Sequence, residues 1–359
     1  MKQYTKHRAN LLLATLLSLN TLLACVNTGR ALNMERPSSA TTSRTAEAGQ
    51  NDENSTELHF LALKNDIDGM KQHAADPKNK AHANAQDRYG ARPHHLAAAN
   101  GFMEFIILLK QLIPSTDLTA RCNHGQNLFH WAAINGHHNI ISLVTYYPLL
   151  YKSLAVKDKN GDTPIHLGVK TNNGPFIKEL IACSPNTDVN ILNNKGLAPL
   201  QIAVTIDYQK RDKKKEEDRQ IALIQALRKS AKLNGNIQGD KGNAPIHVVA
   251  KLGFYKALEA LLDIPGIYVS IQNNKGDTAT HILLRKLLRR DIYQKDGEKI
   301  ENIIKRLIDQ PGFDPNIKNN KDKTILDEAA CSASEEIITL LKNSAKKARS
   351  RTIRSKSLN

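Results

Sequence analysis

Ile271-Gln272-Asn273-Asn274-Lys275-Gly276 recurs along the chain in near-copy. One copy is Ile191-Leu192-Asn193-Asn194-Lys195-Gly196, and another is Ile317-Lys318-Asn319-Asn320-Lys321-Asp322. Each copy is followed by the start of a predicted helix and then by an apolar helical stretch. A sequence that repeats itself in this way indicates a stacked array, in which each unit buries its apolar face against the next.

The copies belong to a longer series that can be aligned on the glycine, or its substitute, before each helix start. The aligned positions are 90, 125, 161, 196, 242, 276 and 322. Most steps are about 35 residues long and two are about 46 residues long, which is the range of repeat proteins. Proline occupies the first turn of several predicted helices, where its fixed φ fits and its missing N–H is not needed. These prolines are Pro93, Pro164, Pro199 and Pro245.

The stretches Gly161-Asp162-Thr163-Pro164-Ile165-His166-Leu167 and Gly242-Asn243-Ala244-Pro245-Ile246-His247-Val248 resemble the ankyrin-repeat signature, G-x-T-P-L-H-x-A-A-x-x-G. The resemblance implies an all-α repeat solenoid of about eight ankyrin-like units over residues 54–345. Each unit would consist of a β-hairpin loop plus two antiparallel helices. Single units depart from the signature: His94 replaces its leucine in the second unit, and Gln201 replaces its histidine in the fifth.

Two units carry an extra segment of about a dozen residues, one near 209–219 and one spanning 285–299. Both segments fall between the first and second helices of their unit. We therefore expect two lengthened helical hairpins that project from the same edge, with lysine and glutamate at helical spacings. Two interpretations stay open: simple solvated extensions, or a shared edge that contacts a partner.

The N-terminus combines three cations with a short apolar run, Leu11–Leu19, which is typical of a secretory signal peptide. The run ends in Leu22-Leu23-Ala24-Cys25, which resembles the bacterial lipoprotein box. That resemblance implies a signal peptide over 1–24, cleavage before Cys25 and lipidation of its sulfur. Ordinary signal cleavage and an uncleaved anchor are the alternatives. Residues 25–53 have almost nothing to bury, so we expect a disordered tether there.

The net charge of +16 raises the question of nucleic-acid binding. Three cations lie in the predicted signal peptide and seven more near the C-terminus, with no acid after Glu336. The array itself is therefore only mildly basic, and we do not expect it to bind nucleic acid. We predict a basic disordered tail over 346–359. This tail is either a solvated terminus or a segment that contacts anionic lipid headgroups, RNA or a nuclear-import receptor.

The chain contains none of the motifs that mark common enzyme or metal sites. It has no G-x-S-x-G, H-E-x-x-H, G-x-G-x-x-G or Walker A sequence, and its four cysteines show no C-x-x-C spacing. We therefore expect no catalytic, metal-binding or cofactor-binding residue. Cys183 falls on a second helix and is expected in the core, whereas Cys122 falls near a hairpin that could expose it. The histidines at the signature position are expected to hydrogen-bond within and between hairpins: His59, His95, His130, His166, His247 and His281.

By resemblance, partner contacts are expected at the hairpin tips and on the faces of the first helices. Trp131, the only tryptophan, is either a binding anchor or a packing residue between first helices. The asparagines of the repeated phrase are either partner contacts or turn-forming residues. The candidate partner-binding residues are Arg88, Tyr89, Arg92, Asn123, His124, Gln126, Trp131, Lys159, Asp162, Asn194, Lys195, Asn274, Lys275 and Asp277.

These features predict a non-catalytic protein-interaction scaffold that is monomeric and tethered to a membrane through lipidated Cys25. The expected location is the bacterial cell envelope, with the outer membrane favoured because Val26 follows the cysteine instead of aspartate. The alternative is a secreted bacterial effector that binds a host protein through the same array. That alternative rests on family analogy alone.

Overall fold

The computed structural model describes residues 54–205, 212–331 and 333–356. All of them belong to Arg44–Asn359, one of two units into which contacts divide the chain. The regular elements of the described residues are helices, with no strand among them, and the nearest approach to a sheet there is an isolated bridge between Lys318 and Thr324. The predicted signal peptide and tether, including Cys25, lie outside the described residues.

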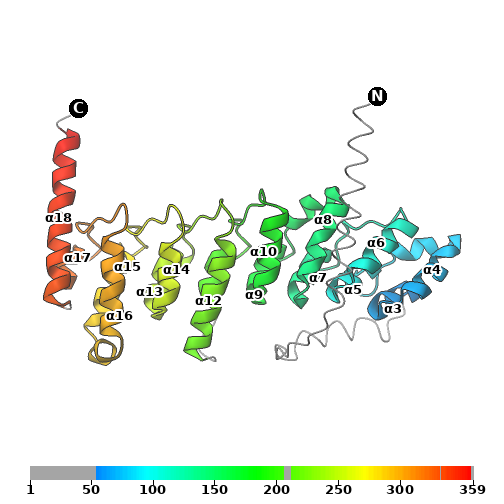
Figure 1. Cartoon of the computed structure of the whole chain (residues 1–359), viewed down its shortest axis with the longest axis horizontal. Coiled ribbons are helices and arrows are strands. Elements are labelled where there is room, and N and C mark those ends of the chain that lie inside the picture. Colours follow the sequence, from blue (N-terminus) through cyan, green and yellow to red (C-terminus); the bar gives the residue numbers. More distant parts are fainter. Residues whose placement is uncertain (1–53, 206–211, 332, 357–359) are drawn as a thin grey trace, which may run out of the picture. The chain divides into compact units, whose positions relative to one another are not determined.

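The described helices form successive pairs. The first helices of the pairs contact one another in sequence order (Figure 1). They are α3 (Glu57–Lys64), α5 (Pro93–Ala99), α7 (Leu128–Asn135), α9 (Pro164–Lys170), α11 (Pro199–Thr205), α13 (Pro245–Leu252), α15 (Ala279–Leu287) and α17 (Ile325–Ala329). Their partners are α4 (Ile67–Ala75), α6 (Met103–Leu112), α8 (Leu143–Tyr146), α10 (Gly174–Cys183), α12 (Lys213–Leu227), α14 (Tyr255–Leu262), α16 (Arg290–Ile308) and α18 (Glu335–Lys356).

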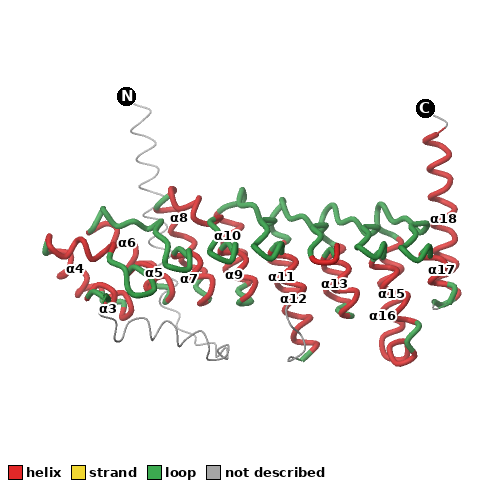
Figure 2. Tube along the Cα trace, turned by 180° about the vertical axis from the view of Figure 1, so that it is seen from behind, coloured by secondary structure: helices red, strands yellow, loops and turns green. Residues whose placement is uncertain are grey.

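Short 3₁₀ segments complete the connections: η1 (Pro77–Asn84), η2 (His138–Ser142), η3 (Pro148–Ala155) and η4 (Asp240–Gly242). The loops that join successive pairs run along one edge of the helices (Figure 2). The all-α solenoid expected from the sequence is confirmed. The expected β-hairpin loops are turns without strands among the described residues. One backbone hydrogen bond closes each of them, as between the N–H of Asn273 and the carbonyl of Asp277.

Local sequence explains where the first helices begin and end. Pro93, Pro164 and Pro245 each stand at the start of their helix, as the signature predicts. Gly253 ends α13 in the left-handed conformation at φ +76°, which a residue with a β-carbon adopts only with strain. The first helices are consequently short and begin at equivalent positions in successive pairs.

One hydrophobic core extends from Leu58 to Leu341 through the whole stack. Small residues such as Ala97, Ala98 and Ala133 are fully buried on the first helices, which lets neighbouring pairs approach closely. Large side chains fill the space between the first and second helices; the phenylalanines among them are Phe105, Phe129, Phe176 and Phe254. Burial of one such side chain stabilises the fold by roughly 1.5–3 kcal/mol. Each unit therefore depends on its neighbours for most of its stability.

The two lengthened units differ from their neighbours in the second helix. α12 has 15 residues and α16 has 19, whereas α10 has 10 and α14 has 8. Both long helices extend past their neighbours on the same side (Figure 1). The charged run near 209–219 partly falls in 206–211, outside the described residues, and its remainder forms the first turns of α12. The prediction of lengthened hairpins at a common edge agrees with this arrangement.

The C-terminal segment differs from the expectation of a tail that is disordered from residue 346. α18 continues as helix to Lys356. Its last turns contain no glycine or proline, and alanine, lysine and arginine are strong helix formers. High charge alone therefore does not end this helix.

Candidate functional site

The turns that contain the repeated phrase, here called the hairpin tips, are folded by the first asparagine of each Asn-Asn-Lys copy. Oδ1 of Asn273 accepts hydrogen bonds from the backbone N–H groups of Lys275 and Asp277, at 2.9 and 3.1 Å. Asn193 and Asn319 make the same two bonds in their own tips. Together with the backbone hydrogen bond from the N–H of Asn273 to the carbonyl of Asp277, this side chain fixes the shape of the tip.

The second asparagine of each copy connects its tip to the preceding one. The backbone N–H of Asn320 donates to the carbonyl of Lys275 at 3.0 Å, and its Nδ2 donates to the carbonyl of Asn274 at 3.0 Å. Asn194 bonds the carbonyls of Asn160 and Lys159 in the same way. A β-carbon on Gly276 would lie only 2.6 Å from Oδ1 of Asn320, so this contact requires glycine. The asparagines are therefore turn-forming and tip-joining residues.

The lysine of each copy is left on the surface. Lys195, Lys275 and Lys321 are exposed, and within the described residues their ammonium groups make no hydrogen bond or ion pair. Lys159, in an earlier tip, is exposed in the same way. Each of these lysines belongs to a tip that is held to its neighbour by backbone hydrogen bonds. We call these four residues the tip lysines: a series of free cations on a fixed edge.

The signature histidines join successive units from the inside. In His166, Nδ1 accepts a hydrogen bond from the N–H of Thr163, and Nε2 donates to the carbonyl of Leu197 in the next unit. This arrangement needs a neutral ring with its proton on Nε2. Burial accordingly lowers the pKa of His95 to about 3 and that of His130 to about 4. These residues have the structural role that the sequence predicts.

Gln201 shows that the role of the histidine depends on its hydrogen bonds and not on its charge. Its Oε1 accepts from the N–H of Ala198 at 2.8 Å, and its Nε2 donates to the carbonyl of Ile237 at 3.0 Å. An amide supplies the same acceptor and donor as a neutral imidazole. The departure of this unit from the signature therefore preserves the function of the position.

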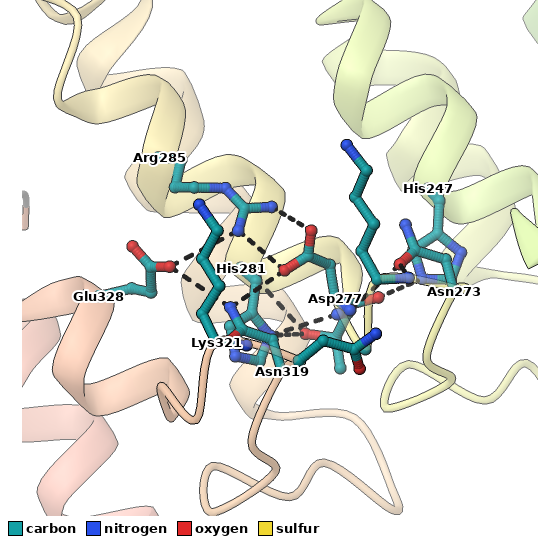
Figure 3. Close-up of polar contacts among 12 residues, drawn as sticks. His247, Asn273, Asp277, His281, Arg285, Asn319, Lys321 and Glu328 are labelled. Atoms are coloured by element: carbon teal, nitrogen blue, oxygen red, sulfur yellow. Dashed lines mark hydrogen bonds and ion pairs between the residues drawn. The ribbon is translucent and has the colours of Figure 1, made fainter. Parts of the chain in front are cut away.

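A buried acid, Asp277, connects the tip of the seventh pair to α15 and to the following tip (Figure 3). Oδ1 of Asp277 accepts from Nη1 of Arg285 at 2.8 Å and from Nδ2 of Asn319 at 3.1 Å, while Arg285 also reaches Glu328 at 3.5 Å. Burial opposes ionisation of Asp277, but the hydrogen bonds from Arg285 and Asn319 outweigh it and hold its pKa below the usual range. Asp162 has an equivalent place, with an ion pair to Lys170 and a hydrogen bond from Asn193.

The candidate partner-binding residues fall into three groups by exposure. The exposed ones are Arg88, Asn123, His124, Lys159, Asn194, Lys195, Asn274 and Lys275. The half-buried ones are Tyr89, Arg92, Gln126 and Trp131. Asp162 and Asp277 are buried and bonded inside the array, so they position the tips and present no surface. Lys321, in the third copy of the repeated phrase, is also exposed, although it is not among the residues expected from the sequence.

Two of the half-buried residues are engaged with neighbouring helices. The guanidinium of Arg92 donates to Asn84 at 3.1 Å and pairs with Asp117 at 3.4 Å. Trp131 packs against the core, with its ring 5.9 Å from that of His95 on the adjacent first helix. Of the two interpretations of this tryptophan, the packing contact between first helices is the one that the described residues contain.

The other titratable and sulfur-containing side chains do not form a reactive site among the described residues. No group of histidine, cysteine and acidic side chains there could hold a metal ion. Cys183 is partly buried against the core, and burial with a hydrogen bond to Glu179 raises the pKa of its thiol to about 11. Cys122 is buried, although its place near a hairpin could have exposed it, and its backbone N–H donates to the carbonyl of Gln126 across the tip. No described helix has the length and apolar character needed to cross a bilayer.

Comparisons with known proteins agree with this architecture. A family model described as ankyrin repeats (3 copies) matches residues 58–148. α-Latrotoxin-Lg1a of Latrodectus geometricus is 29% identical over 183 residues, covering 51% of this chain and 12% of the toxin. The nuclear factor NF-κB p105 subunit of Gallus gallus is 25% identical over 223 residues, covering 61% of this chain and 20% of that protein. The chain thus spans only a small part of the length of these relatives.

The solved structures include the ankyrin repeat domain of Bcl-3, described as a unique member of the IκB protein family. It superposes with a TM-score of 0.52 at 21% identity, covering 70% of this chain and 99% of that domain. Ankyrin repeats generally mediate protein–protein interaction, and their domains are typically non-catalytic. The chain therefore contains ankyrin repeats, and its described part has the ankyrin-repeat fold.

Proposed function

We propose that this chain is a non-catalytic scaffold that binds an acidic surface of a protein partner through the tip lysines. The observation that carries the proposal is the different use of the three residues in each Asn-Asn-Lys copy. Both asparagines form hydrogen bonds that fold each tip and join it to the one before. By contrast, Lys195, Lys275 and Lys321 are exposed and have no acidic partner among the described residues.

The arrangement favours an extended charged partner over a small ligand. The tip lysines lie in the fourth, fifth, seventh and eighth units along one edge, so a partner that contacts several of them must follow the stack. Exposed charges of one sign accelerate association with a complementary surface and select against partners of the same sign. Because such charges are screened at a Debye length of about 8 Å in physiological salt, binding is expected to weaken as ionic strength rises.

The test uses the full chain with Lys195, Lys275 and Lys321 replaced by glutamate. The matched control carries the same charge change at Lys178, Lys229 and Lys256, which are exposed on or beside the second helices. Proteins retained from a cell lysate by the wild type and the control, and lost by the tip variant, would be purified and titrated directly. Equal affinity of the purified partner for the tip variant and the wild type would contradict the proposal.

We also propose that the scaffold is monomeric and tethered to the bacterial envelope through lipidated Cys25. Support comes from the sequence Leu22-Leu23-Ala24-Cys25 after a short apolar run. Membrane fractionation with N-terminal peptide mass, comparing the wild type with Cys25→Ala, tests the tether. An acylated wild type in the membrane and an unprocessed variant support it. Release of an unmodified protein into the medium would instead favour a secreted effector that binds a host protein.

A further inference from the structure

Three hydrogen-bond donors converge above Gly253, at the C-terminus of α13. Nζ of Lys286 lies 3.1 Å from the position that a β-carbon on this glycine would occupy, and Nζ of Lys213 and the hydroxyl of Tyr255 each lie 3.4 Å from it. The three side chains come from α15, α12 and α14 respectively. Segments far apart in the sequence thus direct two ammonium groups and one hydroxyl to a single point.

The two ammonium groups lie close together, and the charge of one acid, Asp296, partly offsets that of Lys286. Within the described residues neither ammonium makes an ion pair, and Nζ of Lys213 lies over the rings of Phe254 and Tyr255, 5.9 Å from each ring centroid. Burial, followed by the charges of Lys213 and Arg289, lowers the pKa of Lys286. Two like charges at such close range are unfavourable unless an anion joins them.

The nearest acids are committed to other groups. Oε1 of Glu217 accepts the backbone N–H of Lys256 at 2.8 Å, at the start of α14. Oδ1 of Asp296, on the long helix α16, pairs with Nζ of Lys299 at 2.9 Å. These two acids, with burial as the larger cause, raise the pKa of Tyr255 to about 12, so its hydroxyl keeps its proton and can donate at neutral pH.

We propose that Lys213, Lys286 and Tyr255 form a binding site for a phosphate group. A phosphate monoester carries a charge close to −2 at neutral pH and has three strong acceptor oxygens, which matches two ammonium groups and one hydroxyl donor. Gly253 has no side chain between the three donors, so a phosphate that lies against this glycine can direct its oxygens toward all three. The group is presented either by a phosphorylated side chain of a protein or as free phosphate. The site does not depend on the tip lysines, which belong to other segments of the chain.

The site also gives a role to one of the lengthened units. Lys213 is the first residue of α12, so only the longer helix brings this ammonium over the adjacent pair. The neighbouring α16 begins directly after Arg289, a further cation that acts on Lys286. The extra segments had two open interpretations, solvated extensions or partner contacts. The proposed site favours a contact role for the first extra segment, near 209–219.

The experiment titrates the full chain with inorganic phosphate, a phosphoserine peptide and the same peptide without phosphate, by calorimetry. Lys213→Gln with Lys286→Gln is expected to weaken phosphate binding about 100-fold, from roughly tenfold for each charge-assisted bond. Tyr255→Phe is expected to weaken it to a smaller extent. The control Lys214→Gln with Lys251→Gln removes two exposed cations nearby and is expected to leave binding unchanged. Tighter binding of the phosphopeptide identifies a phosphorylated partner, and equal or tighter binding of inorganic phosphate identifies the free ion.

Thermal unfolding separates a binding role from a structural one. Because the two ammonium groups repel, the double glutamine variant is expected to unfold at the same or a higher temperature than the wild type without ligand. Phosphate is expected to raise the unfolding temperature of the wild type and not that of the variant. A folded wild type that binds no phosphate probe, or a variant that binds as tightly as the wild type, would overturn the proposal.

Discussion

Nε2 of His247 donates a hydrogen bond to the carbonyl oxygen of Asp277, 3.0 Å away in the next unit (Figure 3). The same nitrogen lies 3.0 Å from the carbonyl of Ile271. Nδ1 accepts from the N–H of Ala244, so one ring closes its own helix start and fastens the following tip. The contact between these units thus depends on a buried, neutral imidazole that carries its proton on Nε2.

Replacing this histidine with glutamine is expected to lower the free energy of unfolding only slightly. His247→Gln preserves one acceptor and one donor, as Gln201 does in its own unit, so the cost should stay below about 1 kcal/mol. His247→Leu fills the space but leaves the N–H of Ala244 and the facing carbonyl groups unsatisfied, for a cost of about 2–4 kcal/mol. Urea unfolding of the two variants measures the difference, and equal losses would contradict this account.

Replacing either of the adjacent histidines His94 and His95 with leucine is expected to change the stability of the fold, in opposite directions. His94 is fully buried, and neither ring nitrogen has a partner among the described residues, whereas His95 bonds the N–H of Arg92 and the carbonyl of Ala120. His94→Leu restores the residue of the signature and should stabilise the fold by roughly 1–3 kcal/mol. His95→Leu should destabilise it by a similar amount. Thermal or urea unfolding of both variants and the wild type measures the sign of each stability change.

Acid is expected to unfold the array through its buried histidines. The pKa of His95 falls from 6.5 to about 3 on folding and that of His130 to about 4, so the unfolded chain binds more protons. The stability that they contribute is complete above pH 6.5 and decreases as pH falls below it. The slope is about 1.4 kcal/mol per pH unit for each histidine until the folded pKa is reached.

The measurement is the free energy of unfolding between pH 4.5 and 7.5. The variant His130→Gln removes one titrating group while keeping its hydrogen bonds, so its stability should decrease less steeply with acid than that of the wild type. Identical slopes would mean that His130 remains able to bind its proton in the folded state.

Loss of the buried acid is expected to destabilise the seventh pair far more than loss of a surface acid. Asp277→Ala leaves Arg285 and Asn319 without their shared acceptor, at a cost of about 2–3 kcal/mol, since Arg285 is partly exposed and keeps Glu328. Asp68→Ala removes a carboxylate that is 87% exposed and paired with Lys71, and should cost less than about 0.5 kcal/mol. Chemical unfolding of both variants measures the two losses of stability and shows whether that of Asp277→Ala is the larger.

The described cysteines are expected to react with a thiol reagent in an order set by burial. Cys331 is exposed and should be modified first. Cys183 is half-buried with a raised pKa, so little thiolate is present at neutral pH. Cys122 is buried and should react only when its unit opens. Peptide mass mapping over time measures the three rates, and early labelling of Cys122 would show that its tip is open in solution.

The sequence was sufficient for the parts of the fold that depend on near neighbours. Pro164, Thr163 and His166 lie within four positions of one another, and their spacing alone predicts a capped helix start. The burial of Cys122 was not predictable in the same way, because it depends on how the tip closes through Gln126. The helix α18 extends to Lys356, beyond the sequence expectation, because the helix propensity of its alanine, lysine and arginine residues outweighs their charge.

The sequence does not predict that the three donors meet near Gly253, because their proximity depends on how the helices pack. Lys213 and Lys286 are in different units, and no local pattern relates them. Their proximity follows from the length of α12 and from the packing of α13 between its neighbours. By contrast, the repeated phrase identified the tips directly, although only the structure separates the asparagines that fold them from the lysines that remain free.

Each hairpin tip described above is tied to the tip before it by a backbone hydrogen bond, which the N–H of Asn194, Asn274, Asn320 or Lys159 donates. A whole unit could therefore be duplicated or deleted and the two cut ends would still meet with matching donors and acceptors. The chain is in this respect modular in an evolutionary sense. Its reach along a partner can change by one unit at a time, while the surviving units keep their shape.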